Sequence, residues 1–175
     1  MSFREDLLGR FRWIDGHADI LGLFADDGFL VAAAETLGAP FEPAGITKVA
    51  GVEARGFILG TAVAVHLGVG FVPIRKAGAI HPGPKAVRQA GPDWRGNQPT
   101  LMIQRAALRS DERVLLVDDW IETGSQALAA RALIEDCGAR YAGLSVLVDQ
   151  SREEVRQALL PIAFVVSSAE LPPSL

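Results

Sequence analysis

The sequence predicts an α/β fold in which a parallel sheet carries helices on both faces. Short apolar runs alternate with helical stretches along the chain, as is typical of βαβ units. The run from Val114 to Val117 is apolar at every position, which is expected of a strand covered on both faces. With 175 residues, 49% of them hydrophobic, the chain can bury one sizeable core. We therefore expect a single domain that spans residues 1–175.

The predicted elements alternate in a regular order. Apolar runs of strand length occur at 49–51, 71–74, 114–117, 144–148 and 162–166. Residues 57–67 and 127–137 show helical spacing, and Gly138 closes the second of these helices. In such sheets ligands bind beyond the carboxyl ends of the strands. This rule marks residues 53–55, residues 75–76 and the segment from Asp118 onward as the active edge.

Residues 77–99 interrupt this order. They contain four glycines and four prolines and show no sustained periodicity. A structureless segment of this length in a compact domain is usually a functional lid or a disordered insertion, and we call it the lid segment. As a lid it would bring positive charge over the active edge, from Lys85, Arg88 and Arg95. Two further members, His81 and Trp94, either cover a ligand or lie exposed.

Composition excludes several classes of function. The net charge of −4 gives no electrostatic reason to expect binding to nucleic acid or to an anionic membrane. The single cysteine, Cys137, rules out an intrachain disulfide and fits a reducing compartment. The N-terminal residues lack a long hydrophobic run, so we expect no signal peptide or membrane anchor and a cytoplasmic location. The histidines lie far apart, so no metal site made of protein ligands is predicted.

The segment VLLVDDWIETGSQ, residues 114–126, joins a buried strand to a helix that begins near Ser125. The first N–H groups of a helix have no partner within it, and such an end binds phosphate. Gly124 permits a close approach of the backbone. Asp118 and Asp119 would repel a phosphate, but they are good acceptors for vicinal hydroxyls. The motif predicts a ribose 5-phosphate cradle; the alternative is a strand end with solvated acids and an ordinary capped helix.

The run VLLVDDWIETGS resembles the phosphoribosyl diphosphate motif of type I phosphoribosyltransferases. Residues 49–78, VAGVEARGFILGTAVAVHLGVGFVPIRKAG, are similar to the adenine-specific members of that family. The resemblance covers roughly residues 45–150. It implies the type I phosphoribosyltransferase fold, with a small hood from residue 1 to about 30 and a flexible lid at 77–99, and a homodimer.

The implied activity is Mg²⁺-dependent transfer of phosphoribose from 5-phosphoribosyl 1-diphosphate to a purine base. Adenine is the leading base, and the products are a nucleoside monophosphate and pyrophosphate, as in purine salvage. Two alternatives stay open. One is transfer to a 6-oxopurine or another base, and the other is a protein without transferase activity that senses phosphoribosyl diphosphate or a nucleotide.

The resemblance also implies roles for individual residues. Ribose and its phosphate would be held by Asp118, Asp119, Glu122, Thr123, Gly124, Ser125 and Gln126. The diphosphate, which needs fixed cations as it leaves, would be held by Glu53, Ala54, Arg55, Arg75, Lys76 and Lys85. The base would lie against Trp13, Ile14, Trp120 and Ile121, although core packing is an equal alternative for Trp13 and Ile14. The expected catalytic residues are Glu122, Asp119 and Asp118, and Mg²⁺ arrives with the diphosphate.

Three departures from the adenine-specific members bear on the base. The lid lacks their glutamate, and Asp93 is the only acid nearby. Ala79 stands where a lysine is usual. Glu122 replaces a small residue, at a position where the hypoxanthine and guanine enzymes place an aspartate by the purine N7. A carboxylate there suggests a group that takes a proton from the base; the alternative is a Glu122 that points to solvent or pairs with Arg55 or Lys85.

Overall fold

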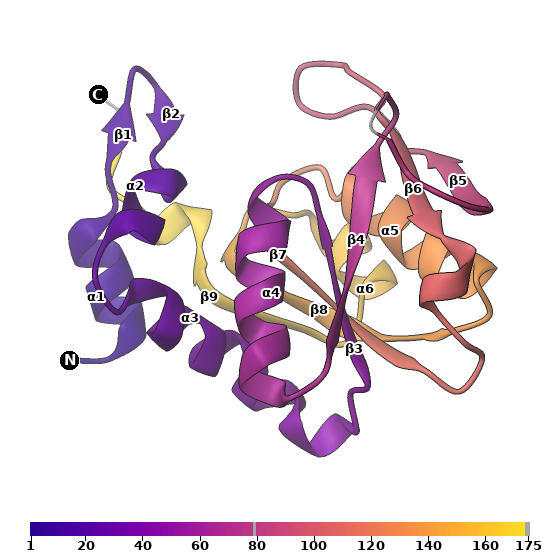
Figure 1. Cartoon of the computed structure of the whole chain (residues 1–175). Helices are drawn as coiled ribbons and strands as arrows, with labels where there is room; N and C mark the ends of the chain where they lie inside the picture. Colours follow the sequence, from indigo (N-terminus) through magenta and orange to yellow (C-terminus); the bar gives the residue numbers. More distant parts are fainter. Residues whose placement is uncertain (79, 174–175) are drawn as a thin grey trace.

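The computed structural model of the chain, which describes residues 1–78 and 80–173, contains a seven-stranded sheet with the order β5-β6-β4-β3-β7-β8-β9 (Figure 1). Its strands are β3 (Lys48–Val52), β4 (Gly70–Lys76), β5 (Lys85–Gln89), β6 (Thr100–Gln104), β7 (Arg113–Ile121), β8 (Arg140–Asp149) and β9 (Ile162–Ser167). The strands from β4 to β9 in this order pair in parallel. The α/β class predicted from the alternating runs is confirmed.

Helices cover both faces of the sheet, as predicted. The chain forms α1 (Phe3–Arg10), α2 (Ile20–Ala25), α3 (Phe29–Gly38), α4 (Arg55–Leu67), α5 (Ser125–Asp136) and α6 (Glu153–Ala158). Of these, α4 and α5 contact several strands of the sheet, and α1 and α2 contact α3. Val114 and Leu116 of β7 pack with Leu133 of α5, whereas Leu115 and Val117 pack with residues of α1, α3 and α4. Alternate residues of the continuous apolar run thus enter two different cores, because successive strand residues face opposite sides. Among the described residues, no helix is long and apolar enough to cross a membrane.

The expectation of a structureless lid segment is wrong for residues 85–89. They form β5, which pairs antiparallel with β6, and β6 pairs antiparallel with β4, so the sheet is not wholly parallel. Only Ala86 of β5 is buried, and a short edge strand with charged side chains leaves little apolar pattern to detect. Ala79, where the usual lysine is missing, lies outside the described residues.

The N-terminal elements pack against the C-terminal end of the chain (Figure 1). The hairpin of β1 (Trp13–Ile14) and β2 (His17–Ala18) turns at Asp15-Gly16, and both residues have positive φ, as two-residue hairpin turns require. Trp13 Nε1 donates to the carbonyl oxygen of Pro172 at 2.7 Å. Arg4 of α1 forms an ion pair with Glu170. These contacts hold Trp13 beside the sheet.

Two glycines allow α4 to start directly on the sheet. A Cβ at Gly51 of β3 would collide with the carbonyl oxygen of Gly56, in the first turn of α4. A Cβ at Gly56 would lie 3.0 Å from Asp118 Oδ1 and 3.2 Å from the carbonyl oxygen of Val117. The first turn of α4 is therefore packed against the carboxyl ends of β3 and β7.

We expect Gly51→Ala to lower the free energy of unfolding by about 2–3 kcal/mol, because the added methyl group must displace backbone rather than a flexible side chain. For a chain of this size, that loss corresponds to a decrease in Tm of roughly 4–12 °C. Gly9→Ala is the matched control, since no heavy atom of residues 1–78 and 80–173 lies within 4 Å of the added methyl group and alanine favours a helix. Thermal unfolding followed by circular dichroism measures both, and an unchanged Tm for Gly51→Ala would contradict the close packing.

Candidate active site

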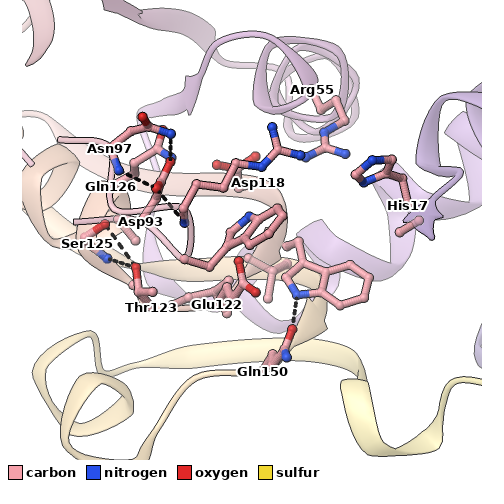
Figure 2. A pocket seen from close by; sticks show the side chains of 18 of the residues that line it. His17, Arg55, Asp93, Asn97, Asp118, Glu122, Thr123, Ser125, Gln126 and Gln150 are labelled. Atoms are coloured by element: carbon pink, nitrogen blue, oxygen red, sulfur yellow. Dashed lines mark hydrogen bonds between the residues drawn. The ribbon is translucent and has the colours of Figure 1, made fainter. Parts of the chain in front are cut away.

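A cavity of about 720 Å³ lies beyond the carboxyl ends of β7 and β8, the edge predicted for ligands. It joins residues of the N-terminal hairpin, the lid segment, the first residue of α4 and the turn between β7 and α5 (Figure 2). The sequence-predicted residues in its lining are Trp13, Arg55, Lys76, Asp118, Trp120, Ile121, Glu122, Thr123, Gly124, Ser125 and Gln126. Most of the predicted site is therefore brought together in one place.

The two acids of the motif lie in different surroundings. β7 continues to Ile121, so both acids lie within the strand rather than after it. Asp118 lines the cavity, and its Oδ1 accepts a hydrogen bond from the Asp119 N–H at 2.9 Å. Burial raises the pKa of Asp118 well above its usual value, and the nearby charge of Asp119 raises it further.

Asp119 is 3% exposed and does not line the cavity. Its Oδ2 lies 3.0 Å from Nε of Arg55, although this buried oxygen has no hydrogen-bond partner among the described residues. Arg55 in turn is the first residue of α4 and lines the cavity. The structure thus places Asp118 at the cavity and Asp119 outside its lining, as the charge partner of Arg55.

The phosphate turn, residues 123–126, has the predicted geometry of a helix start. Gly124 has a φ of 72°, and a Cβ there would collide with Val155 of α6, so only glycine fits. The Ser125 N–H donates to Thr123 Oγ1 at 3.3 Å. The N–H groups that follow lie in the first turn of α5, where a helix supplies no partner. A phosphate placed here would meet these groups and the positive end of the helix dipole.

Only part of the predicted diphosphate site reaches the cavity. Glu53 and Ala54 are joined by a non-proline cis peptide bond. Glu53 accepts hydrogen bonds from Arg75 Nε at 3.2 Å and from the Lys76 N–H at 3.0 Å. Arg75 Nη1 also donates to the carbonyl oxygen of Ile80 in the lid segment. Arg75 therefore joins Glu53 to the start of the lid segment. Of the cations predicted for the diphosphate site, Arg55 and Lys76 line the cavity.

The lid segment covers the cavity with its tip rather than with all of its cations. Asp93 accepts hydrogen bonds from the N–H groups of Arg95 and Asn97, and these three residues and Trp94 line the cavity. Lys85 and Arg88 do not line it; Arg88 instead donates two hydrogen bonds to Asp136 of α5. The expectation that Arg88 covers the active edge is wrong, because a carboxylate distant in the sequence binds it.

His81 and Trp94 of the lid segment have different environments. Trp94 is 60% exposed, lines the cavity and stacks with the Arg95 guanidinium. His81 is buried and does not line the cavity. The burial of His81, and then the charges of Arg75 and Lys85, lower its pKa. His81 therefore neither covers the cavity nor lies exposed.

Two tryptophans, Trp13 and Trp120, form an aromatic wall in the cavity. The rings of Trp13 and Trp120 meet edge to face, with centroids 6.2 Å apart, and Trp120 Nε1 donates to Gln150 Oε1 at 2.9 Å. Ile14, predicted to contact the base, is 54% exposed and does not line the cavity. Its cross-strand partner in β2, His17, lines the cavity.

Gln150 also lines the cavity but was not predicted from the sequence. The signal was available, because Gln150 follows the predicted strand 144–148 and ligands bind beyond the carboxyl ends of such strands.

Glu122 faces the cavity without a cation. Burial raises the pKa of its carboxyl, and the charge of Asp93 raises it further. Among the described residues Glu122 forms no ion pair, so the alternative pairing with Arg55 or Lys85 is not observed. A carboxylate with a raised pKa at a ligand cavity is suited to accept a proton from a bound group.

No cluster of three His, Cys, Asp or Glu residues that could hold a metal occurs in residues 1–78 and 80–173. Mg²⁺ is commonly held by one or two carboxylates together with substrate phosphates rather than by a protein cage. Asp118 at the cavity provides one such carboxylate. The donor set therefore fits a magnesium ion that enters with a phosphorylated ligand.

Known proteins with similar sequences are phosphoribosyltransferases. Residues 32–162 match the family model for the phosphoribosyl transferase domain. The chain is 41% identical over 131 residues to the adenine phosphoribosyltransferase of Streptomyces coelicolor, covering 75% of this chain and 70% of that one. It is 47% identical over 132 residues to the adenine phosphoribosyltransferase of Dinoroseobacter shibae, covering 75% and 72%.

Solved structures with a similar fold are also adenine phosphoribosyltransferases. The adenine phosphoribosyltransferase of Giardia lamblia, complexed with 9-deazaadenine, has a TM-score of 0.85 at 32% identity, with 96% of this chain and 98% of that chain covered. The adenine phosphoribosyltransferase of Rhodothermus marinus has a TM-score of 0.82 at 31% identity, with 95% and 98% covered. The similarity therefore extends over almost the whole chain, beyond the segment that carries the sequence motif.

The raised pKa of Asp118 predicts that this residue lowers the stability of the folded state at neutral pH and not in acid. Because the folded state holds the proton of Asp118 to higher pH than the unfolded state does, the free energy of unfolding falls as pH rises above about 4. Asp118→Asn should therefore raise Tm near about pH 7, and the gain should shrink toward about pH 4.

Asp111→Asn is the control, because this aspartate is exposed and its pKa is lowered by Arg109. Its substitution should change stability by less than about 0.5 kcal/mol. Differential scanning calorimetry across the pH range measures both variants, and a lower Tm for Asp118→Asn at neutral pH would contradict the assignment.

Proposed function

The chain belongs to the phosphoribosyltransferase family, and we propose that it transfers phosphoribose from 5-phosphoribosyl 1-diphosphate to adenine, in purine salvage. The observation that carries the proposal is the order of groups around one cavity. The phosphate turn, Asp118, the cations Arg55 and Lys76, and the wall of Trp13 and Trp120 all line it. These groups match the 5-phosphate, the ribose hydroxyls, the diphosphate and the base of the two substrates.

The reaction breaks the bond between ribose C1 and the diphosphate oxygen, and forms a bond from C1 to a base nitrogen. As pyrophosphate leaves with the bonding electrons, positive charge develops on the ribose ring. Arg55 and Lys76 stabilise the negative charge on the leaving group, and the turn and Asp118 hold the ribose in place. The site thus acts by positioning and by stabilising separated charge.

The proton that the base nitrogen loses passes to Glu122. This carboxylate faces the cavity, and its raised pKa makes it a better proton acceptor than an exposed glutamate. Mg²⁺, carried with the diphosphate, would neutralise part of the charge on the leaving group. Asp118 is the residue placed to hold that ion or the ribose hydroxyls.

The proposal treats residues 1–175 as one unit, since residues of the N-terminal hairpin and of the lid segment line the same cavity. A cytoplasmic location is supported by the single free cysteine. A homodimer is supported by the family resemblance alone.

The direct test of the activity incubates the purified protein with phosphoribosyl diphosphate, Mg²⁺ and one base at a time. We expect pyrophosphate release and nucleotide formation with adenine, and much less with hypoxanthine or guanine. A reaction without Mg²⁺ is the control. Turnover only with a 6-oxopurine would overturn the choice of base, and binding of phosphoribosyl diphosphate without turnover of any base would favour a sensing protein instead.

Glu122→Ala tests the proton acceptor. Loss of a general base should lower kcat by roughly 10²–10⁴-fold, with KM for phosphoribosyl diphosphate nearly unchanged, because the interaction matters mainly in the transition state. Since Asp93 contributes to the raised pKa of Glu122, Asp93→Asn should shift the acidic limb of the kcat profile to lower pH. Undiminished turnover by Glu122→Ala would return this residue to a passive role.

A further inference from the structure

The two indoles of the aromatic wall are each held by a hydrogen bond. An indole N–H can only donate. Trp13 Nε1 donates to a backbone carbonyl, that of Pro172. Trp120 Nε1 instead donates to a side chain, Gln150 Oε1, at 2.9 Å, and Figure 2 shows this bond beside Glu122 at the edge of the cavity. The hydrogen bond that helps to orient Trp120 therefore comes from the Gln150 side chain, and a substitution at residue 150 can remove it.

The backbone around Gln150 is fixed on both sides. Its N–H donates to the carbonyl oxygen of Ile121 at 2.8 Å, which joins the end of β8 to the end of β7. The preceding Asp149 is 1% exposed. Asp149 accepts hydrogen bonds from Ser151 and from Arg156. The Gln150 amide is thus presented from a rigid point, although the residue itself is exposed.

We propose that Gln150 is a positioning residue that sets the affinity for the base by fixing the Trp120 indole. The inference rests on the proposed function, because it assigns the aromatic wall to the base. Without an acceptor at Gln150, the indole N–H would lose its side-chain partner, and the ring contacts with Phe11 and Trp13 would be left to orient Trp120. The ring could then take other orientations, which would weaken its contact with the base.

The ribose phosphate half of the cavity should not respond to this change. Asp118 and the phosphate turn are held by the backbone of β7 and α5 and by Thr123, and neither group contacts Gln150 in the hydrogen-bond network of the described residues. A ligand with the base and a ligand without it therefore separate the two halves of the site.

The experiment measures the dissociation constants of AMP and ribose 5-phosphate by calorimetry. For Gln150→Leu we expect a roughly threefold to tenfold weaker affinity for AMP, the effect of one lost hydrogen bond, and unchanged affinity for ribose 5-phosphate. Gln157→Leu is the matched control, because within the described part of the chain the side chain of this exposed glutamine bonds only to Glu153, outside the cavity. Equal weakening of both ligands, or of neither, would overturn the positioning role.

A double-mutant cycle decides how Gln150 acts. Trp120→Phe keeps an aromatic ring but has no N–H to donate, so Gln150→Leu should cause no further loss of AMP affinity in that background. A loss that persists there would show direct contact with the base and overturn the positioning role. Wild-type protein that binds AMP no more tightly than ribose 5-phosphate would instead overturn the proposed function itself, which keeps the two failures distinct.

Discussion

The close approach of α4 to the sheet is the constraint on which the site depends. Gly51 and Gly56 leave no Cβ between β3 and the first turn of α4, so Arg55 begins the helix next to the end of β7. There its guanidinium lies 3.0 Å from Asp119 and also faces the cavity. A larger residue at either glycine would move the helix start, and with it the cation that joins the buried Asp119 to the cavity.

The charged side chains of the site form two groups, those buried behind the cavity and those that line it. Asp119 is almost fully buried and is compensated by Arg55, whose side chain remains 44% exposed. Arg55 can therefore meet an anion while it keeps its contact with Asp119. Asp118 and Glu122 have no such partner among the described residues, and their pKa values are raised. Asp118 and Glu122, unlike Asp93 in the same lining, are thus the acids that favour a proton, a hydroxyl or a cation from a ligand.

The sequence predicted the features that local pattern determines, and missed those that arise from contacts between distant segments. β7 and α5 were predictable because a strand buried on both faces is continuously apolar and a phosphate turn has its own residue types. β5 was missed because only Ala86 is buried in it. The pairing of Arg88 with Asp136 and the exposure of Ile14 depend on tertiary contacts that no local periodicity records.

One continuous segment, residues 118–126, provides most of the chemistry of the cavity. Asp118 comes first, Trp120 and Glu122 follow, and the phosphate turn ends the segment. Trp120 and Glu122 lie between the two groups proposed to hold the ribose phosphate, and Glu122 is one of the departures from the adenine-specific pattern. Trp120 takes its partner from β8 and packs against the N-terminal hairpin, whereas Asp118 and the turn depend on the backbone around them. We therefore expect that substitutions at these two positions alter the proposed base site and leave the proposed ribose phosphate cradle unchanged.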